Sequence, residues 1–311
     1  MKQQFLLMIL GFMMAAGTVQ TVRAVPAEVT ACGQVLAASG EYVLANNLNC
    51  SGTGDYNGVT IIASSVTLHL AGRTVASTDC DLERNLSGIF VAGGLTDVKI
   101  DGGAVSGFNN GIVLSSSNSV VEGVTVSRAC QFGIAVQGSN NVVRTNTITA
   151  NGDGVALSPA VDARVASNNL SGNNRAGVVI SDTSAGNIIE DNVLNNNGAD
   201  SDEGYGVAIF SGSGNTVRRN AADRNDFGIR ISSPGNQANN NTVSGNSQLG
   251  IWVSTGGVPA SVRRNSVFGN GLSDMFDESA ACGGNLWRGN RFMTDLVNGA
   301  PNGGPDLGCL R

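Results

Sequence analysis

The sequence predicts an all-β fold, a parallel β-helix in which the chain winds into stacked coils of short strands. A phrase that opens with glycine and continues with apolar residues recurs along the chain, as in Gly111-Ile112-Val113-Leu114. Its glycines are Gly88, Gly111, Gly133, Gly154, Gly177, Gly206, Gly228 and Gly250. They lie 23, 22, 21, 23, 29, 22 and 22 residues apart, and each interval holds three apolar runs that are too short for helices. This period matches one coil of a parallel β-helix, with about ten coils in all, and the leucine scaffold of a leucine-rich repeat is missing.

A second periodicity predicts how the coils are held together. One asparagine per coil precedes an apolar residue by two positions: Asn146, Asn168, Asn192, Asn220, Asn241 and Asn265. Another follows each of these five residues later: Asn151, Asn173, Asn197, Asn225, Asn246 and Asn270. Asparagine suits tight corners, and stacked coils about 4.8 Å apart would let equivalent amides hydrogen-bond in a ladder. The alternative is a ligand-binding surface, but the regular register favours the corner role.

The two ends of the chain differ from the repeats between them. Residues 1–24 have the lysine, apolar run and small-residue cleavage site of a secretory signal peptide, and the run is too short to span a membrane. We therefore expect an exported protein, periplasmic or extracellular, with no membrane span. A solenoid needs covers at its ends, so residues 25–58 are expected as an N-terminal cap, 59–271 as the β-helix and 272–311 as a C-terminal cap.

Six cysteines in an exported chain indicate disulfides. Their positions bracket the expected caps, which predicts a Cys32–Cys50 bridge and a Cys282–Cys309 bridge. Cys80 and Cys130 remain, and they would pair if the loop from residue 77 to 86 folds across a coil. Metal-bound or reactive thiols are disfavoured because the chain has no Cys-x-x-Cys motif.

The Gly-Ile-x-Val openings and the Asn-x-Val-x-x-Asn corners between Gly88 and Asn270 carry a resemblance. The chain resembles the secreted right-handed parallel β-helix superfamily, which includes pectate lyases, polygalacturonases, alginate epimerases and NosD-type periplasmic copper proteins. Cys32-Gly33 and the segment 66–75 are similar to the first coil of bacterial members. The resemblance implies a single-stranded right-handed β-helix, and the positions of the cysteines predict that disulfides staple its caps. It implies an acidic polysaccharide as partner, but many activities share this scaffold.

The catalytic patterns of these families are largely missing. Polygalacturonases would need paired aspartates, a Gly-His-Gly and an Arg-Ile-Lys, whereas Ser232 follows Arg230 and Ile231 here. The only histidine, His69, alternates with leucines and is expected to point outward from the stack. Copper is disfavoured because few Met, His or Cys ligands remain outside the expected disulfides.

The coil between Gly177 and Gly206 is longer than the others because of an acidic insertion at residues 197–205. A solenoid accommodates such an insertion as a protruding loop, and such loops often lie beside a binding face. Asp200, Asp202 and Glu203 in the insertion are the expected ligands of Ca²⁺, the one cofactor that the sequence suggests. The alternative is a solvated excursion with no ligand.

The outward position of the glycine phrases changes from small residues to Arg230 and Trp252 in the last two coils. Together with Tyr205 they are the expected substrate-binding residues, because a sugar ring would stack on the tryptophan and its carboxylate would meet the arginine. The catalytic candidates are Asp202, Glu203, Asp226 and Arg230. The structural alternatives are that Arg230 pairs with Asp226 and that the C-terminal cap covers Trp252.

Charge limits the function further. Without Lys2 and Arg23 the chain has 18 − 2 = 16 basic and 24 acidic residues, a net charge of 16 − 24 = −8. Binding of nucleic acid is therefore not expected, although Arg218-Arg219 and Arg263-Arg264 fall at the same position of two coils and could hold an anionic polysaccharide. Two function classes remain open: a polysaccharide lyase, hydrolase or epimerase, and a non-catalytic cell-surface or periplasmic β-helix that binds glycan or serves as a structural element. The oligomeric state is open as well.

Overall fold

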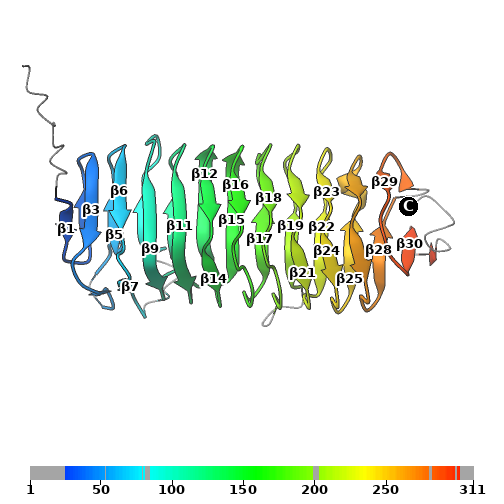
Figure 1. The fold of residues 1–311 in the computed structure, drawn as a ribbon, viewed down its shortest axis with the longest axis horizontal. Helices are drawn as coiled ribbons and strands as arrows, with labels where there is room; N and C mark the ends of the chain where they lie inside the picture. Colours follow the sequence, from blue (N-terminus) through cyan, green and yellow to red (C-terminus); the bar gives the residue numbers. More distant parts are fainter. Residues whose placement is uncertain are drawn as a thin grey trace, which may run out of the picture.

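The computed structural model describes residues 25–52, 54–78, 80, 85–198, 203–279, 282–297 and 300–301. The chain winds into about eleven stacked coils that form one elongated body (Figure 1). The described part is built from short strands joined by turns, with a 3-10 helix, η1, at Thr255–Gly257. The parallel β-helix predicted from the glycine and asparagine repeats is confirmed, with about one coil more than expected. The predicted signal peptide, residues 1–24, lies outside the described residues.

Three parallel sheets run along the body. The 15-stranded sheet contains β1 (Ala27–Val29), β3 (Gly40–Leu44), β4 (Leu48–Asn49), β6 (Val66–His69), β7 (Thr74–Ala76), β9 (Lys99–Ser106), β11 (Val120–Ser127), β13 (Val142–Arg144), β14 (Thr147–Thr149), β16 (Arg164–Ala166), β18 (Ile188–Glu190), β20 (Thr216–Arg218), β23 (Gln237–Asn239), β26 (Ser261–Arg263) and β29 (Leu286–Arg288). The 13-stranded sheet contains β2 (Gln34–Leu36), β5 (Val59–Ile61), β8 (Ser87–Val91), β10 (Asn110–Leu114), β12 (Phe132–Ser139), β15 (Asp153–Val161), β17 (Ala176–Ile180), β19 (Tyr205–Ile209), β22 (Phe227–Ile231), β25 (Leu249–Val253), β28 (Ser273–Asp277), β30 (Asp295–Val297) and the antiparallel β31 (Ala300–Pro301). The third sheet contains β21 (Ala221–Asp223), β24 (Thr242–Ser244) and β27 (Ser266–Phe268).

The core is a set of stacked aliphatic columns. On the 13-stranded sheet, the residue after each phrase glycine points inward and is fully buried, as Ile112, Ile134 and Val155 show. The glycine itself is required by space, because a Cβ at Gly111 would lie 2.5 Å from the carbonyl oxygen of Gly133 in the next coil. Each coil therefore packs directly on its neighbour, and the fold repeats without gaps.

The asparagine ladders are confirmed. The backbone N–H and the side-chain Nδ2 of Asn192 both donate to Oδ1 of Asn220, each at 3.0 Å, and Asn220 donates to Asn241 in the same way. The first ladder runs through Asn146, Asn168, Asn192, Asn220, Asn241, Asn265 and Asn290. The second runs through Asn151, Asn173, Asn197, Asn225, Asn246, Asn270 and ends on Asp274. A third, which the sequence reasoning missed, links Asn187, Asn215 and Asn236.

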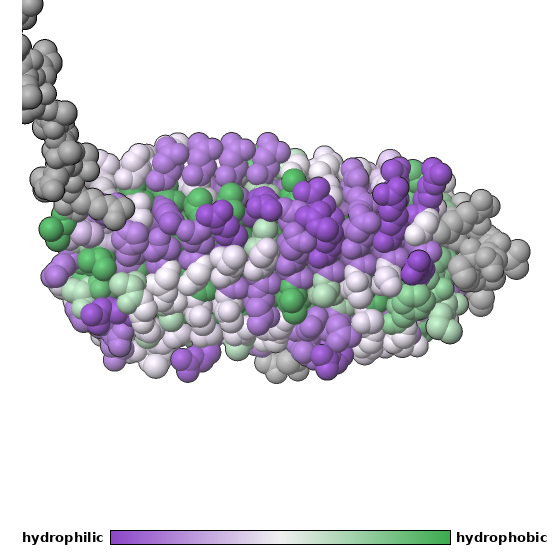
Figure 2. All heavy atoms as spheres, in the orientation of Figure 1, coloured by the Kyte–Doolittle hydropathy of each residue, from purple (hydrophilic) through white to green (hydrophobic). Residues whose placement is uncertain are grey.

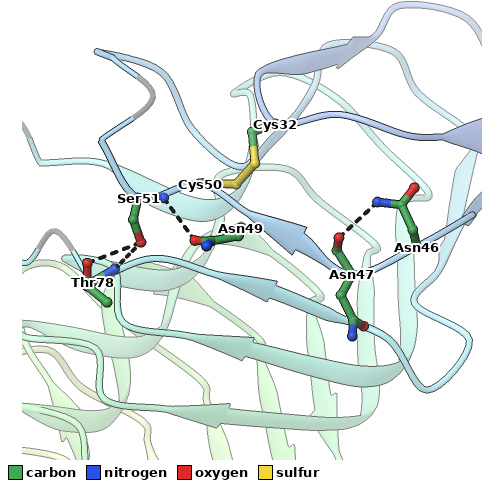
Figure 3. Close-up of a disulfide and its surroundings, with 7 residues drawn as sticks. All are labelled: Cys32, Asn46, Asn47, Asn49, Cys50, Ser51 and Thr78. Atoms are coloured by element: carbon green, nitrogen blue, oxygen red, sulfur yellow. Dashed lines mark hydrogen bonds between the residues drawn. A yellow bond between two sulfur atoms is a disulfide. The ribbon is translucent and has the colours of Figure 1, made fainter.

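Disulfides tie the first coils together. Cys32 is bonded to Cys50 with 5.6 Å between the Cα atoms, as predicted (Figure 3). The expected pairing of Cys80 with Cys130 is also present, with a Cα separation of 6.0 Å. Cys282 is disulfide-bonded as well, but Cys309, its expected partner, lies outside the described residues.

Strand pairing continues across the expected boundaries of the caps. β2 pairs with β5 on the N-terminal side, and β28 pairs with β25 beyond residue 271. The division into caps and a central helix stays a prediction. Hydrophilic side chains form bands along the face drawn in Figure 2, with smaller hydrophobic patches between them. Within the described part of the chain, no helix is long and apolar enough to cross a membrane.

Candidate functional site

A long groove lies on the outer face of the 13-stranded sheet, and we call it the sheet groove. It consists of two adjoining cavities of about 650 and 520 Å³ that share Phe132, Ala135 and Gln137 in their linings. Small outward residues form its floor, because Ala135 pairs in register with Ala156, and Ala156 pairs with Val179. The groove is therefore a trough between taller neighbouring side chains.

The sheet groove runs along the axis of the solenoid. Its lining extends from Ser87 on β8 to Tyr205 on β19, across five strand-to-strand steps of about 4.8 Å, or roughly 24 Å. Tyr205 and Phe210 line the other end, in an edge-to-face contact with 5.8 Å between ring centroids. A trough of this length is suited to an extended chain rather than to a single small molecule.

An ion pair between Asp153 and Arg175 lies in the larger cavity. Asp153 opens β15 and is 6% exposed, while Arg175 precedes β17 in the next coil and reaches it with Nη2 at 2.7 Å from Oδ2. The backbone N–H of Ala176 donates to the other carboxylate oxygen at 3.1 Å. Burial raises the pKa of Asp153 above its usual value, although Arg175 and these hydrogen bonds oppose the shift. The Arg175 side chain is 53% exposed, so its remaining donors are open to the groove.

A series of hydrogen-bonded side chains, Arg230, Tyr205 and Glu203, lies at the end of the groove. Nη1 of Arg230 donates to the Tyr205 hydroxyl at 2.8 Å, and the hydroxyl donates to the carboxylate of Glu203. Burial and the hydrogen bond to Glu203 raise the pKa of Tyr205 to about 12, while Arg230 opposes the shift. Tyr205 is therefore a neutral phenol at physiological pH. Glu203 and Tyr205 both line the larger cavity.

Arg230 and Trp252 are brought together by neighbouring strands, but they pack against each other. The two residues pair in register on β22 and β25, and the guanidinium lies 4.1 Å from the centroid of the Trp252 ring. The ring also stacks against Phe276 and makes a tilted contact with Phe227. Of the three expected substrate-binding residues, Tyr205 lines the cavity, whereas Arg230 and Trp252 are half-buried and are not among its lining residues. Arg230 and Phe227 both contact Tyr205 and hold it in place.

The remaining candidates are distributed differently. Asp226 accepts hydrogen bonds from the backbone N–H of Gly204 at 2.8 Å and the hydroxyl of Ser247 at 2.6 Å, and it lines a separate depression. It has no ion pair with Arg230, whose described partners are Tyr205, Ser232 and Glu203.

The expected calcium site is only partly described. Asp200 and Asp202 lie outside the described residues, and Glu203, the third expected ligand, lines the sheet groove. Among the residues that the structure describes, no group of three His, Cys, Asp or Glu side chains could hold a metal ion. The calcium site stays a prediction. His69 is half-buried on the 15-stranded sheet, where Nδ1 lies 2.7 Å from Oδ1 of Asp101.

The sequence reasoning did not place Asp153 and Arg175 in the site. The predicted site rested on bulky outward residues, but the groove lies where the outward residues are small. The signal was present, because Ala135, Ala156 and Val179 form a run of small residues beside a column that contains Phe132 and Asp153. A trough flanked by an exposed arginine and a buried carboxyl group is the arrangement that could bind a polar chain.

Comparisons with known proteins agree with this fold. The family model described as "Right handed beta helix region" matches residues 35–194 and 162–295. A search of curated protein sequences found no match to this chain.

Solved structures of similar fold include enzymes of alginate. The A-module of Azotobacter vinelandii mannuronan C-5 epimerase AlgE4 is 18% identical, with a TM-score of 0.53, and the match covers 84% of this chain and 81% of that one. An alginate lyase from Paenibacillus sp. str. FPU-7 is 14% identical, with a TM-score of 0.58 over 75% of this chain and 95% of the lyase. The periplasmic alginate epimerase AlgG is 15% identical, with a TM-score of 0.55 over 85% and 70%. At these identities the similarity shows the fold alone. Together with the family match over most of its length, it shows that this chain belongs to the right-handed β-helix family.

Proposed function

We propose that this protein binds an acidic polysaccharide along the sheet groove, with Arg175 holding a uronate carboxylate. The observation that carries the proposal is the exposed guanidinium of Arg175, which Asp153 positions inside a cavity of about 650 Å³. One of its nitrogens is bonded to Asp153, and the others can meet a carboxylate in two parallel hydrogen bonds. We propose as well that the protein is exported to the periplasm or out of the cell, which its disulfides support.

The shape of the groove supports a polymer as ligand. The trough is roughly 24 Å long and open to solvent along its length, and aromatic rings of Phe132, Tyr205 and Phe210 offer apolar surface to sugar rings. Enzymes of alginate, an acidic polysaccharide, share the fold. A neutral sugar chain would offer no carboxylate to the Arg175 donors that Asp153 does not occupy.

Two substitutions test the binding site. Arg175→Gln removes the charge-assisted hydrogen bonds and should weaken binding of a mannuronate oligosaccharide by about 1.5–3 kcal/mol, a factor of more than ten. Ala156→Leu puts a larger side chain on the floor of the trough and should weaken binding by steric exclusion. Arg73→Gln, which changes an exposed arginine elsewhere, is the matched control. Titration calorimetry measures all four proteins, and parental affinity in both groove variants would refute the proposal.

A second candidate function is catalysis on the bound uronate. The observation that favours it is Asp153, a buried carboxyl group inside the groove whose pKa burial raises, because perturbed carboxyl groups in a groove are candidates for general acid–base catalysis. Incubation with mannuronate and guluronate polymers separates the alternatives. A lyase produces unsaturated ends that absorb ultraviolet light, and an epimerase changes the uronate composition seen by NMR. If neither occurs while binding persists, the protein is a binding or structural β-helix.

A further inference from the structure

A second groove lies on the 15-stranded sheet, and we call it the arginine groove. Its volume is about 630 Å³. Its lining consists of Thr216, Arg218, Arg219, Gln237, Asn239, Asn240, Arg263, Arg264, Arg288 and Gly289. Five of these are arginines and none is acidic or aromatic. The sheet groove and the arginine groove have no lining residue in common.

The register of the sheet aligns the arginines along the axis. Arg218 pairs with Asn239, Asn239 with Arg263, and Arg263 with Arg288. These four positions lie on β20, β23, β26 and β29, at successive steps of about 4.8 Å. Arg219 and Arg264 extend the charge at the turns that follow two of these strands. The result is a row of cationic groups about 14 Å long.

The charge of this row is compensated at one end alone. Arg218 and Arg219 bond to Glu190, which is 1% exposed, and Arg219 also pairs with Asp191 at 2.9 Å. Burial would raise the pKa of Glu190, but its hydrogen bonds with arginines lower the value to about 2, so the carboxylate is ionised at neutral pH. These two acids hold the first arginines rigidly.

The other end has no counter-charge. Arg263, Arg264 and Arg288 are exposed and form no ion pair with any described residue. Like charges at directly neighbouring strand positions destabilise a sheet, and Arg263 lies opposite Arg288. An anion bound between the two arginines would remove this repulsion. A bound anionic ligand would therefore explain why arginines lie opposite each other here.

We propose that the arginine groove is a second binding site for an acidic polysaccharide chain, which lies along the axis with its carboxylates on Arg263, Arg264 and Arg288. Polar side chains between the arginines, among them Gln237 and Asn239, suit sugar hydroxyls. Single-stranded nucleic acid is disfavoured because proteins bind it with aromatic stacking platforms, and the described lining has none. The arginine groove has only cationic charges in its lining, whereas the sheet groove has both signs, and the proposal for the arginine groove does not depend on the sheet groove. Two sites on one rod would let the protein hold one polymer at two points or join two chains.

The test uses a variant in which all three unpaired arginines are replaced, Arg263→Gln, Arg264→Gln and Arg288→Gln, here called the arginine-groove variant. It is made in the parent and in an Arg175→Gln background, which removes the ligand contact proposed for the sheet groove. The probe is a mannuronate oligosaccharide of defined length, measured by titration calorimetry at 50 and 200 mM salt. In the background protein we expect residual binding that falls on the order of tenfold between these salt concentrations, as three neutralised charges require.

The arginine-groove variant should weaken this residual binding at least tenfold and flatten its salt dependence. The matched control replaces three exposed arginines outside the groove, Arg73→Gln, Arg128→Gln and Arg291→Gln, and should bind as the background does. Equal affinities of the two triple variants, or no residual binding in the background, would overturn the proposal. Tighter binding of oligodeoxythymidine than of the uronate would overturn the choice of partner. If Arg175→Gln has no effect and the arginine-groove variant removes all binding, the sheet-groove function fails while this site stands.

Discussion

Replacing Asn220 by leucine tests the role of the asparagine ladders. The Asn220 side chain is 2% exposed, its Oδ1 accepts from the backbone N–H and the Nδ2 of Asn192, and its own Nδ2 donates to Asn241 and to the carbonyl of Ile189. In Asn220→Leu the buried N–H of Asn192 loses its partner, at a cost of about 1–3 kcal/mol. The Nδ2 group also donates to the carbonyl of Arg218, and loss of the bonds made by its two N–H groups adds about 1 kcal/mol for each N–H. The expected destabilisation is therefore about 3–5 kcal/mol.

The matched control is Asn169→Leu, the same substitution at an exposed position whose side chain makes no described hydrogen bond. Surface changes of this kind usually stay within about 0.5 kcal/mol. Urea unfolding followed by circular dichroism compares the midpoints of the two variants, provided that the slope m stays equal. Midpoints that agree within error would show that the ladder contributes no stability beyond that of the stacked strands, and the reasoning would be refuted.

Three further predictions concern stability and use the same unfolding measurement. Gly111→Ala should destabilise by about 1–3 kcal/mol because the added Cβ meets the next coil, whereas Gly93→Ala, with its nearest contact at 3.8 Å, should be tolerated; equal effects would contradict close packing at the glycine column. Glu190→Gln should cost about 1–3 kcal/mol at pH 7. Because the folded state lowers the pKa of Glu190 from 4.5 to about 2, this contribution is present above pH 4.5 and is lost as the pH falls through 2; a constant difference across that range would exclude the linkage. Replacing Cys32 and Cys50 together by serine should cost about 3 kcal/mol for a sequence separation of 18, and an unchanged midpoint would mean that the bridge is dispensable.

The fold was predictable from the sequence because a solenoid repeats its constraints. Each coil needs a glycine where the next coil approaches, and each corner needs an amide that bonds upward and downward, so both leave a period of about 22 residues. Asn192 and Asn220 could be placed on this basis alone. The ladder of Asn187, Asn215 and Asn236 was not predicted because it is shorter, with three described members.

The binding surfaces were less predictable because they depend on side chains of different coils. Asp153 and Arg175 lie 22 residues apart in sequence, a separation that means little until the register places them side by side. The role of Trp252 in ligand binding stays a prediction, because whether an outward aromatic is open depends on its neighbours: the ring is half-buried and stacks against Phe276 of the following coil. Asp200 and Asp202 lie outside the described residues, so the calcium prediction is still open.

The most direct test of the central claim is a crystal structure of the full chain with a bound mannuronate oligosaccharide. We expect the sugar chain to follow the sheet groove between Phe132 and Phe210, with one carboxylate in contact with the guanidinium of Arg175. An empty sheet groove in crystals whose oligosaccharide is bound elsewhere, with Arg175 paired to Asp153 alone, would contradict the proposed function.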